Sequence, residues 1–323
     1  MLILGLESSC DETACAIVKD GREVLANIVA SQIKTHEKFG GVIPEIAARE
    51  HLSAIDVVVS EAFEVAGIER SEIDAFASTV GPGLVGCLLV GLNAGKALSL
   101  VHNKPFIGVN HLQAHICANF IDTDLKPPFI GLLVSGGHTQ IIKVEDYDKQ
   151  TILAQTIDDA VGEVYDKVAR LIGLPYPGGV TLDKLAQSGN PSAFKLPEAK
   201  VQNSEFSFSG LKTAMLRLIQ SFNGEIPVND VCASFQECVS NTLVKKTKFW
   251  MDKFGYKTVV LAGGVAANSE LRKKIFALEN SGYKAYAPAM KYCTDNASMV
   301  ASAAYFNPIK TDNPLNLEVF SRA

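Results

Sequence analysis

The sequence repeats one order of strands and turns, and this repeat constrains the fold more than any other feature. The first copy has three apolar runs joined by two turns, over residues 2–6, 7–13, 14–18, 20–21 and 24–30. The second copy has the same order, over residues 129–134, 135–139, 140–144, 145–150 and 151–157. The Asp-Gly turn at 20–21 between two strand-like runs is a strong hairpin signal. The repeat therefore predicts two similar α/β lobes.

Each copy is followed by a strand that leads into a glycine-rich turn and a helix. Strand 75–80 leads into 81–83, and strand 258–262 leads into 263–268. Further helices are expected over 44–66, where Pro44 takes the first helical position, and over 160–172 and 229–254. Glycine allows positive φ and close approach of a ligand, and successive N–H groups can bind an anion. One such turn needs no ligand to explain it, but the duplicated small-residue turns predict a phosphate-bearing ligand in a cleft between the lobes.

The composition bounds the class of protein. A length of 323 residues corresponds to about two domains, and the expected lobes are 1–125 and 126–323, with a final helix at about 293–306 that can pack back on the first lobe. Acids outnumber bases 35 to 30, which excludes a globally basic nucleic-acid-binding protein but leaves room for a local basic face. The seven cysteines include no C-x-x-C pair, so a reducing cytoplasm is expected rather than a disulfide scaffold.

No membrane association is expected from the apolar segments. Residues 1–9 lack a basic leader and are expected to form a strand rather than a signal peptide. The most apolar window, 84–101, contains Asn93 and Lys96 and is expected to be a buried helix rather than a membrane span.

Two histidines four residues apart form a candidate metal site. His111 and His115 fall in a helix-like segment, 111–120, and therefore share one helix face at the margin of the core. Two imidazoles and a carboxylate suit zinc or iron, and Asp295, just before a helix over 297–306, is the best candidate for the third ligand. Two alternatives stay open: the histidines can be ordinary surface or capping residues, and Asp295 can be a plain helix N-cap.

Short blocks along the chain then identify a family. They are SSCDETA (8–14), GGVIPEIAAREH (40–51), GPGL (81–84), NHLQAH (110–115), LLVSGGHT (132–139), DDAVGEVYDKVAR (158–170), YPGG (176–179), FSFSGLKTA (206–214), ASFQ (233–236), LAGGVAANSELR (261–272) and TDNASM (294–299). With these blocks in this order, the chain resembles the tRNA N6-adenosine threonylcarbamoyltransferase family of the bacterial and mitochondrial type, formerly described as O-sialoglycoprotein endopeptidases. The resemblance extends from Leu2 to about Phe306.

The resemblance implies a duplicated actin-like ATPase fold, as in sugar kinases and heat-shock chaperones, with two lobes around a nucleotide cleft. It implies transfer of a threonylcarbamoyl group from threonylcarbamoyl-AMP to N6 of the adenosine next to the anticodon, in tRNAs that read codons beginning with A. The implied ligands are one divalent ion per subunit, Fe²⁺ or Zn²⁺, and an adenine nucleotide (threonylcarbamoyl-AMP, or ATP and ADP analogues). The implied partners are tRNA, an inactive paralogous subunit and a small ATPase.

The resemblance also assigns roles to residues. The family's metal ligands fall on His111, His115 and Asp295. Its substrate-binding positions fall on Val134, Ser135, Gly136, Gly137, His138, Asp166, Gly179, Asp183 and Asn268. Asp11 and Glu12, in the first small-residue turn, are candidates for the general base or can simply cap that turn, and His138 is a rival base. Val180 stands where the family motif often has proline, which makes the placement of Asp183 less secure.

Two rival functions share parts of this pattern. A zinc protease places its general base, a glutamate, directly after the first histidine, and here that residue is Leu112. An actin-like kinase or ATPase shares the fold but needs no histidine-bound metal. Binding of tRNA requires a local basic surface, and the candidates, which can equally be a solvated helix face, are Lys245, Lys246, Lys248, Lys253, Arg272, Lys273 and Lys274. The helix over 44–66 is the expected docking surface for a partner subunit.

Overall fold

The structure, a computed structural model, describes residues 1–199 and 205–322 and divides into two compact units. Unit 1 comprises Met1–Lys126 and Pro288–Ala323, and unit 2 comprises Pro127–Ala287. The sequence places 126–323 in the second lobe, with the final helix able to return to the first. In the structure, the final segment from Pro288 onward belongs to unit 1, because its helix packs on the first sheet.

The sheet of unit 1 has the strand order β3-β2-β1-β4-β5. The strands are β1 (Leu2–Glu7), β2 (Glu12–Lys19), β3 (Glu23–Ser31), β4 (Ala75–Gly81) and β5 (Phe106–Asn110). Strands β1, β2 and β3 are antiparallel neighbours, whereas β4 and β5 run parallel to β1. Residues 20–22 join β2 to β3, and Asp20 and Gly21 have φ values of 51° and 67°, the positive values typical of tight hairpin turns.

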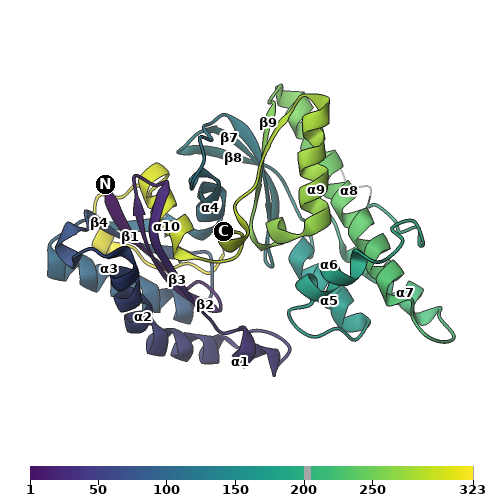
Figure 1. The fold of residues 1–323 in the computed structure, drawn as a ribbon, viewed down its shortest axis with the longest axis horizontal. Coiled ribbons are helices and arrows are strands. Elements are labelled where there is room, and N and C mark those ends of the chain that lie inside the picture. The colour runs from purple at the N-terminus through teal and green to yellow at the C-terminus, as the bar shows by residue number, and fades with distance from the viewer. Residues whose placement is uncertain (200–204, 323) are drawn as a thin grey trace. The chain divides into compact units, whose positions relative to one another are not determined.

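Helices cover both faces of this sheet (Figure 1). They are α1 (Ile33–Glu37), α2 (Pro44–Ala66), α3 (Val85–His102), α4 (His111–Cys117) and α10 (Ala297–Phe306), with short 3₁₀ turns at Arg70–Glu72, Ala118–Phe120, Met290–Tyr292 and Pro314–Asn316. Leu4 and Leu6 of β1 pack in one apolar cluster with residues of α2. Gly5, which points to the opposite face, lies against α10, where a Cβ atom would come within 2.7 Å of the Ala297 carbonyl oxygen. Glycine at this position therefore allows α10 to lie directly on β1.

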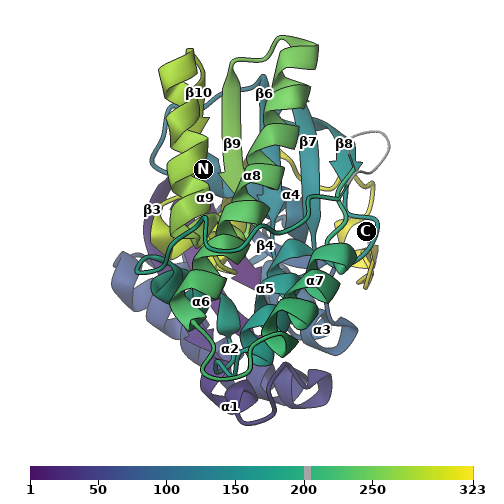
Figure 2. The same ribbon diagram turned by 90° about the vertical axis from the view of Figure 1, so that its right-hand side faces the viewer.

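The sheet of unit 2 repeats this topology in the order β10-β9-β6-β7-β8, which Figure 2 shows from left to right. The strands are β6 (Phe129–Val134), β7 (Thr139–Asp146), β8 (Lys149–Gln155), β9 (Thr258–Ala262) and β10 (Lys284–Tyr286). The helices are α5 (Val161–Leu171), α6 (Gly178–Ala186), α7 (Ser209–Gln220), α8 (Val228–Phe254) and α9 (Ser269–Ala277), with 3₁₀ turns at Gly264–Ala267 and Leu278–Ser281. As in unit 1, two antiparallel pairings are followed by two parallel ones. The predicted duplication is confirmed.

Helix α3 corresponds to the apolar window of the sequence. Among the described residues it is the one helix long and apolar enough to cross a membrane. It packs against β4, α2 and β1, but only 33% of it is buried, less than the buried helix that the sequence predicts.

The segment after α10 lies along the parallel edge of the unit 1 sheet. The amide of Ile309 donates to the carbonyl of Gly108 in β5 at 3.0 Å, and the amide of Phe320 donates to the carbonyl of Val80 in β4 at 3.0 Å. Lys96 of α3 donates to the carbonyl of Leu317 at 2.7 Å. These contacts cover the backbone edge that β5 would otherwise expose.

Candidate active site

The histidine pair is placed by the start of α4. The side chain of Asn110 accepts hydrogen bonds from the amides of Leu112 at 2.9 Å and Gln113 at 3.2 Å, so the helix begins at His111. His111 and His115 lie one turn apart, with ring centroids separated by 4.7 Å. The side chain of His111 is 12% exposed and that of His115 is 1% exposed. The pair is thus more deeply buried than the margin of the core that its sequence pattern predicts.

Asp295 joins the two imidazoles from the other end of the chain. Its Oδ1 atom lies 3.1 Å from Nε2 of His115 and 3.6 Å from Nε2 of His111. The N-cap of α10 is the next residue, Asn296, whose side chain accepts a hydrogen bond from the Met299 amide at 3.2 Å. The alternative that Asp295 is only the helix N-cap is therefore wrong.

The geometry of these three residues fits a single divalent ion. Their ligand atoms all lie within 4.8 Å of one another, and ligands at metal distances of about 2.1 Å lie roughly 3.4 Å apart around a tetrahedral ion. Nδ1 of His115 is buried and has no hydrogen-bond partner among the described residues. The other ring nitrogen, Nε2, faces Asp295. Two imidazole nitrogens and one carboxylate oxygen suit Zn²⁺ and Fe²⁺, and the set leaves positions open for substrate.

Glu7, which the sequence reasoning missed, supports His111 from behind. Its Oε2 atom lies 3.3 Å from Nδ1 of His111, and the hydroxyl of Ser9 lies 3.2 Å from the same nitrogen. The carboxylate is itself held by the Thr79 hydroxyl at 2.6 Å and the Ser9 amide at 2.6 Å, and it is fully buried. A carboxylate on Nδ1 fixes the tautomer and orientation of a metal-binding histidine. The signal in the sequence is a lone acid at the end of an apolar strand.

The charges of this cluster support one another. Burial by itself lowers the pKa of His111, but the Asp295 and Glu7 carboxylates outweigh it and raise this pKa to about 9. Burial raises the pKa of Asp295, but the His111 and His115 imidazoles prevail and lower it to about 2. Burial is also the largest single effect on Glu7 and raises its pKa, but the charge of His111 and the hydrogen bonds of His111 and Thr79 together outweigh it and lower this pKa. The cluster therefore keeps both of its acids ionised.

Asp11 lies in the turn between β1 and β2, and Glu12 is the first residue of β2; both are half-buried. The backbone carbonyl of Asp11 accepts a hydrogen bond from the Gln32 amide at 3.0 Å, and Glu12 accepts one from the Ser31 hydroxyl at 3.4 Å. Burial, with the charges of Asp295 and Asp11, raises the pKa of Glu12 to about 10. Glu12 is therefore protonated near neutral pH in the chain without a metal ion.

In unit 2, the small-residue turn between β6 and β7 presents free backbone amides. The loop is closed by a hydrogen bond from the Ser135 amide to the His138 carbonyl at 2.8 Å and one from the His138 amide to the Ser135 hydroxyl at 3.1 Å. Gly136 and Gly137 are exposed, their amides donate to no other described group, and a Cβ on either would meet open space. Unused N–H groups of this kind can bind an anion.

Asp166 of α5 holds the start of α6. Its Oδ1 atom accepts hydrogen bonds from the amides of Gly178 at 2.9 Å and Gly179 at 3.3 Å, and burial raises its pKa. A Cβ on Gly178 would lie 2.2 Å from that of Ala169, whereas a Cβ on Gly179 would meet only Tyr165, at 3.9 Å. Helix packing therefore requires glycine at 178, while Gly179 leaves space beside the Asp166 carboxylate.

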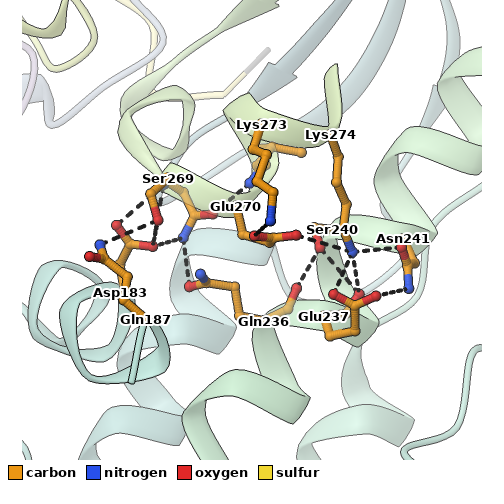
Figure 3. A network of polar contacts seen from close by, with 12 residues as sticks. Asp183, Gln187, Gln236, Glu237, Ser240, Asn241, Ser269, Glu270, Lys273 and Lys274 are labelled. Carbon is orange, nitrogen blue, oxygen red and sulfur yellow. Dashed lines mark hydrogen bonds and ion pairs between the residues drawn. The ribbon is translucent and has the colours of Figure 1, made fainter. Parts of the chain in front are cut away.

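Asp183 and Asn268 meet at the start of α9, where Figure 3 shows Asp183 beside Ser269. Asn268 is the N-cap of α9 and accepts from the Leu271 amide at 2.9 Å. Its side-chain nitrogen donates to Oδ1 of Asp183 at 3.2 Å, and Ser269 donates to Asp183 through its hydroxyl at 2.7 Å and its amide at 3.2 Å. The resemblance thus selected residues that the structure brings into one network in unit 2.

Comparison with known proteins identifies the family. The model of the tRNA N6-adenosine threonylcarbamoyltransferase family matches residues 23–302. The chain belongs to this family. A relative of that name from Caldicellulosiruptor saccharolyticus is 52% identical, covering 96% of this chain and 94% of the relative, and one from Clostridium perfringens is 52% identical over 96% and 93%.

Solved structures of low sequence identity share the fold of this family member. Full-length HypF in a phosphate- and nucleotide-bound form has a TM-score of 0.63 at 15% identity, covering 94% of this chain and 46% of HypF. Component A of the Acidaminococcus fermentans (R)-2-hydroxyglutaryl-CoA dehydratase has a TM-score of 0.55 at 17% identity, covering 94% and 98%. The predicted actin-like ATPase fold is confirmed.

The basic residues proposed to bind the family's tRNA already have partners within the chain. Among the lysines and the arginine of α8 and α9, most pair with acids or carbonyls: Lys245 with Glu198, Lys246 with the Glu205 carbonyl, Lys248 with Asp252, Arg272 with the Ala266 carbonyl, Lys273 with Glu270 and Lys274 with Glu237. The ammonium of Lys253 lies 4.3 Å from the centre of the Trp250 ring. These pairings favour the alternative, a solvated helix face.

Proposed function

We propose that this chain transfers a threonylcarbamoyl group to N6 of an adenosine in tRNA. The observation that carries the proposal is its membership of the family, with relatives of that name about 50% identical over nearly the whole chain. The proposed acceptor is the adenosine next to the anticodon in tRNAs that read codons beginning with A. The proposed donor is threonylcarbamoyl-AMP, a mixed anhydride of a carbamic acid and AMP.

In the proposed reaction, one bond forms and one breaks at the carbamoyl carbon. N6 of adenosine attacks this carbon, the C–O bond to the AMP phosphate breaks, AMP leaves with the electron pair, and N6 loses a proton. The nitrogen is a weak nucleophile because its lone pair is delocalised into the ring. The chain must therefore hold donor and acceptor in register, neutralise the leaving phosphate and accept the proton.

We assign the AMP part of the donor to unit 2. The free amides of Gly136 and Gly137 suit the phosphate, since N–H groups aimed at a developing charge stabilise it. The second oxygen of Asp166, and Oδ2 of Asp183, which accepts only the Ser269 amide, suit the ribose hydroxyls. The space at Gly179 suits the nucleoside. Both side-chain hydrogens of Asn268 are committed within the protein, so its part in binding is to hold Asp183.

We assign a divalent ion, Fe²⁺ or Zn²⁺, to His111, His115 and Asp295. When bound, such an ion supplies Lewis acidity toward the carbamoyl and phosphate oxygens of the donor. The chain's own contribution is rigidity: Glu7 fixes the His111 ring, and the packing of α10 on α4 fixes Asp295.

Asp11, Glu12 and His138 remain the candidates for accepting the N6 proton. Glu12 can act as a base only when it is ionised, and burial together with the charge of Asp295 opposes that. A cation held by Asp295 would lower the pKa of Glu12, because it would cancel the second of these effects.

We propose tRNA, an inactive paralogous subunit and a small ATPase as partners, and the cytoplasm as the compartment. All seven cysteines are free, as a reducing compartment requires.

Helix α2 exposes apolar side chains, among them Leu52 at 65% and Val57 at 62%, and is the proposed docking surface for the paralogous subunit.

The rival functions are not favoured. The relatives are named as transferases, and Leu112 follows the first histidine where a zinc protease needs its glutamate. An actin-like kinase or ATPase gives no role to the cluster of His111, His115 and Asp295.

The test is to replace the cellular gene by variants and measure threonylcarbamoyladenosine in total tRNA by nucleoside mass spectrometry. The wild-type chain should restore the nucleoside, and His111→Ala and Asp295→Ala should leave less than about one hundredth of it. Glu225→Ala, an exposed variant to which no role is assigned, is the control and should restore it fully. Normal levels in either site variant would refute the assignment of these residues.

A further inference from the structure

The network at the start of α9 extends to Gln236 of α8, in the ASFQ block, whose residues have no role in the account so far. The side-chain oxygen of Gln236 accepts a hydrogen bond from the side-chain nitrogen of Asn268 at 2.9 Å, and Gln236 is 3% exposed. The Asn268 side chain therefore links Gln236 to Asp183, and Figure 3 labels Gln236, Asp183 and Ser269 in this network.

The Asn268 amide is committed at three points. Its oxygen accepts from the Leu271 amide at 2.9 Å, and its nitrogen donates to Gln236 at 2.9 Å and to Asp183 at 3.2 Å. A primary amide has two N–H donors, so both are used. In the opposite orientation, the amide oxygen would face two acceptors, Asp183 and Gln236. The orientation of the Asn268 amide is therefore fixed.

The consequence for Asp183 is an unequal use of its two oxygens. Oδ1 accepts from Asn268 and from the hydroxyl and amide of Ser269, whereas Oδ2 accepts only the Ser269 amide, at 3.2 Å. A carboxylate offers about four acceptor sites. Oδ2 therefore keeps acceptor capacity for a ligand.

We infer that Gln236 is a positioning residue for ribose recognition: by holding the Asn268 amide, it keeps Oδ2 of Asp183 free for the hydroxyls of an adenine nucleotide. This inference rests on the nucleotide site of the proposed function and adds to it a residue that does not touch the nucleotide. Without an acceptor at Gln236, one buried N–H of Asn268 loses its partner, which is costly. The same nitrogen already donates to Asp183, so the orphaned N–H competes with the ribose for that carboxylate.

The test compares AMP with 2′,3′-dideoxy-AMP, which lacks both ribose hydroxyls, by titration calorimetry of the full-length protein. Gln236→Met removes the acceptor at similar volume and should weaken AMP binding about fivefold to tenfold, the effect of about one hydrogen bond. Binding of dideoxy-AMP should change less than about twofold. Gln236→Glu keeps the acceptor and should restore AMP binding, because no described residue accepts a hydrogen bond from the nitrogen it replaces.

The matched control is Gln187→Met. Gln187 is another glutamine at the edge of this network, but it donates only to the Ser269 hydroxyl, at 3.5 Å and on the surface. Its loss should therefore leave the affinities for both nucleotides unchanged. Two results would overturn the inference and leave the proposed nucleotide site standing. In the first, Gln236→Met weakens the binding of both nucleotides alike. In the second, it keeps the full preference for AMP over dideoxy-AMP. If the wild-type chain binds AMP and dideoxy-AMP equally, Asp183 does not read the ribose, and the nucleotide site and the inference fail together.

Discussion

Nε2 of His115 lies 3.1 Å from Oδ1 of Asp295, although one residue belongs to α4 and the other to the segment before α10. They meet because α10 packs on α4 and across the unit 1 sheet. At Gly5 of β1 no Cβ holds the helix away. The proposed metal site therefore depends on a packing contact outside it.

Gly5→Ala should weaken both the fold and metal binding. The new methyl would lie 2.7 Å from the Ala297 carbonyl oxygen and 2.8 Å from the Ala301 nitrogen, so α10 must move and Asp295 with it. We expect a loss of about 1–3 kcal/mol in the free energy of unfolding, together with weaker Zn²⁺ binding, measured by denaturant titration and chelator competition.

The control for this variant is Gly41→Ala, since a Cβ on Gly41 meets nothing within 4 Å. It should be close to neutral in both measurements. Unchanged Zn²⁺ affinity in Gly5→Ala would show that the position of α10 does not govern the site.

Glu7→Gln should weaken metal binding while the fold survives. The amide keeps the shape of the side chain but removes the charge that faces Nδ1 of His111. Loss of such a carboxylate typically costs 10-fold to 100-fold in metal affinity, and chelator competition with Zn²⁺ measures it. Glu64→Gln, on the exposed face of α2, is the control and should bind like the wild-type chain. Equal affinities for Glu7→Gln and wild type would remove Glu7 from the account.

Much of the fold could be predicted from the sequence because the apolar runs are long and their ends are marked. The helix from Pro44, the strand over 129–134, the strand over 258–262 and the helix over 297–306 have the predicted bounds. Strands β5 and β10 were missed because they are short, five and three residues, and their pairing depends on neighbours distant in sequence. Helices α6 and α7 were missed because they begin in glycine- and serine-rich segments that resemble turns.

The site was predicted only as far as its motifs extend. The resemblance selected His111, His115 and Asp295, but spacing alone could not decide whether Asp295 is a ligand or the cap of the last helix, a position that Asn296 takes in the structure. Glu7 and Gln236 were missed because each acts through another residue, His111 and Asn268 respectively. Such roles depend on tertiary contacts that no local pattern records.

Asp159 of unit 2 should make stability depend on pH. Hydrogen bonds from Lys212 at 2.6 Å and Lys167 at 2.9 Å lower the pKa of Asp159 below its usual value of 3.8. The unfolded chain therefore takes up a proton at this carboxyl before the folded one does. The stabilisation is fully present above about pH 4 to 5 and is lost as the pH falls through the lowered pKa.

The measurement is denaturant unfolding of wild type and Asp159→Asn at pH 7 and pH 3. The variant should be less stable by about 1 kcal/mol at pH 7, a modest value because both lysines are about one-third exposed. The difference should shrink at pH 3. A difference that stays constant or grows toward acid pH would contradict the ion-pair explanation.

The most direct test of the metal site is an anomalous scattering scan of crystals across the iron and zinc absorption edges, on protein purified without added metal. The account predicts one peak about 2.0–2.2 Å from Nε2 of His111, Nε2 of His115 and Oδ1 of Asp295, and its absence in crystals of His115→Ala. A wild-type crystal with no peak among these three atoms, or a peak of equal height in His115→Ala, would contradict it.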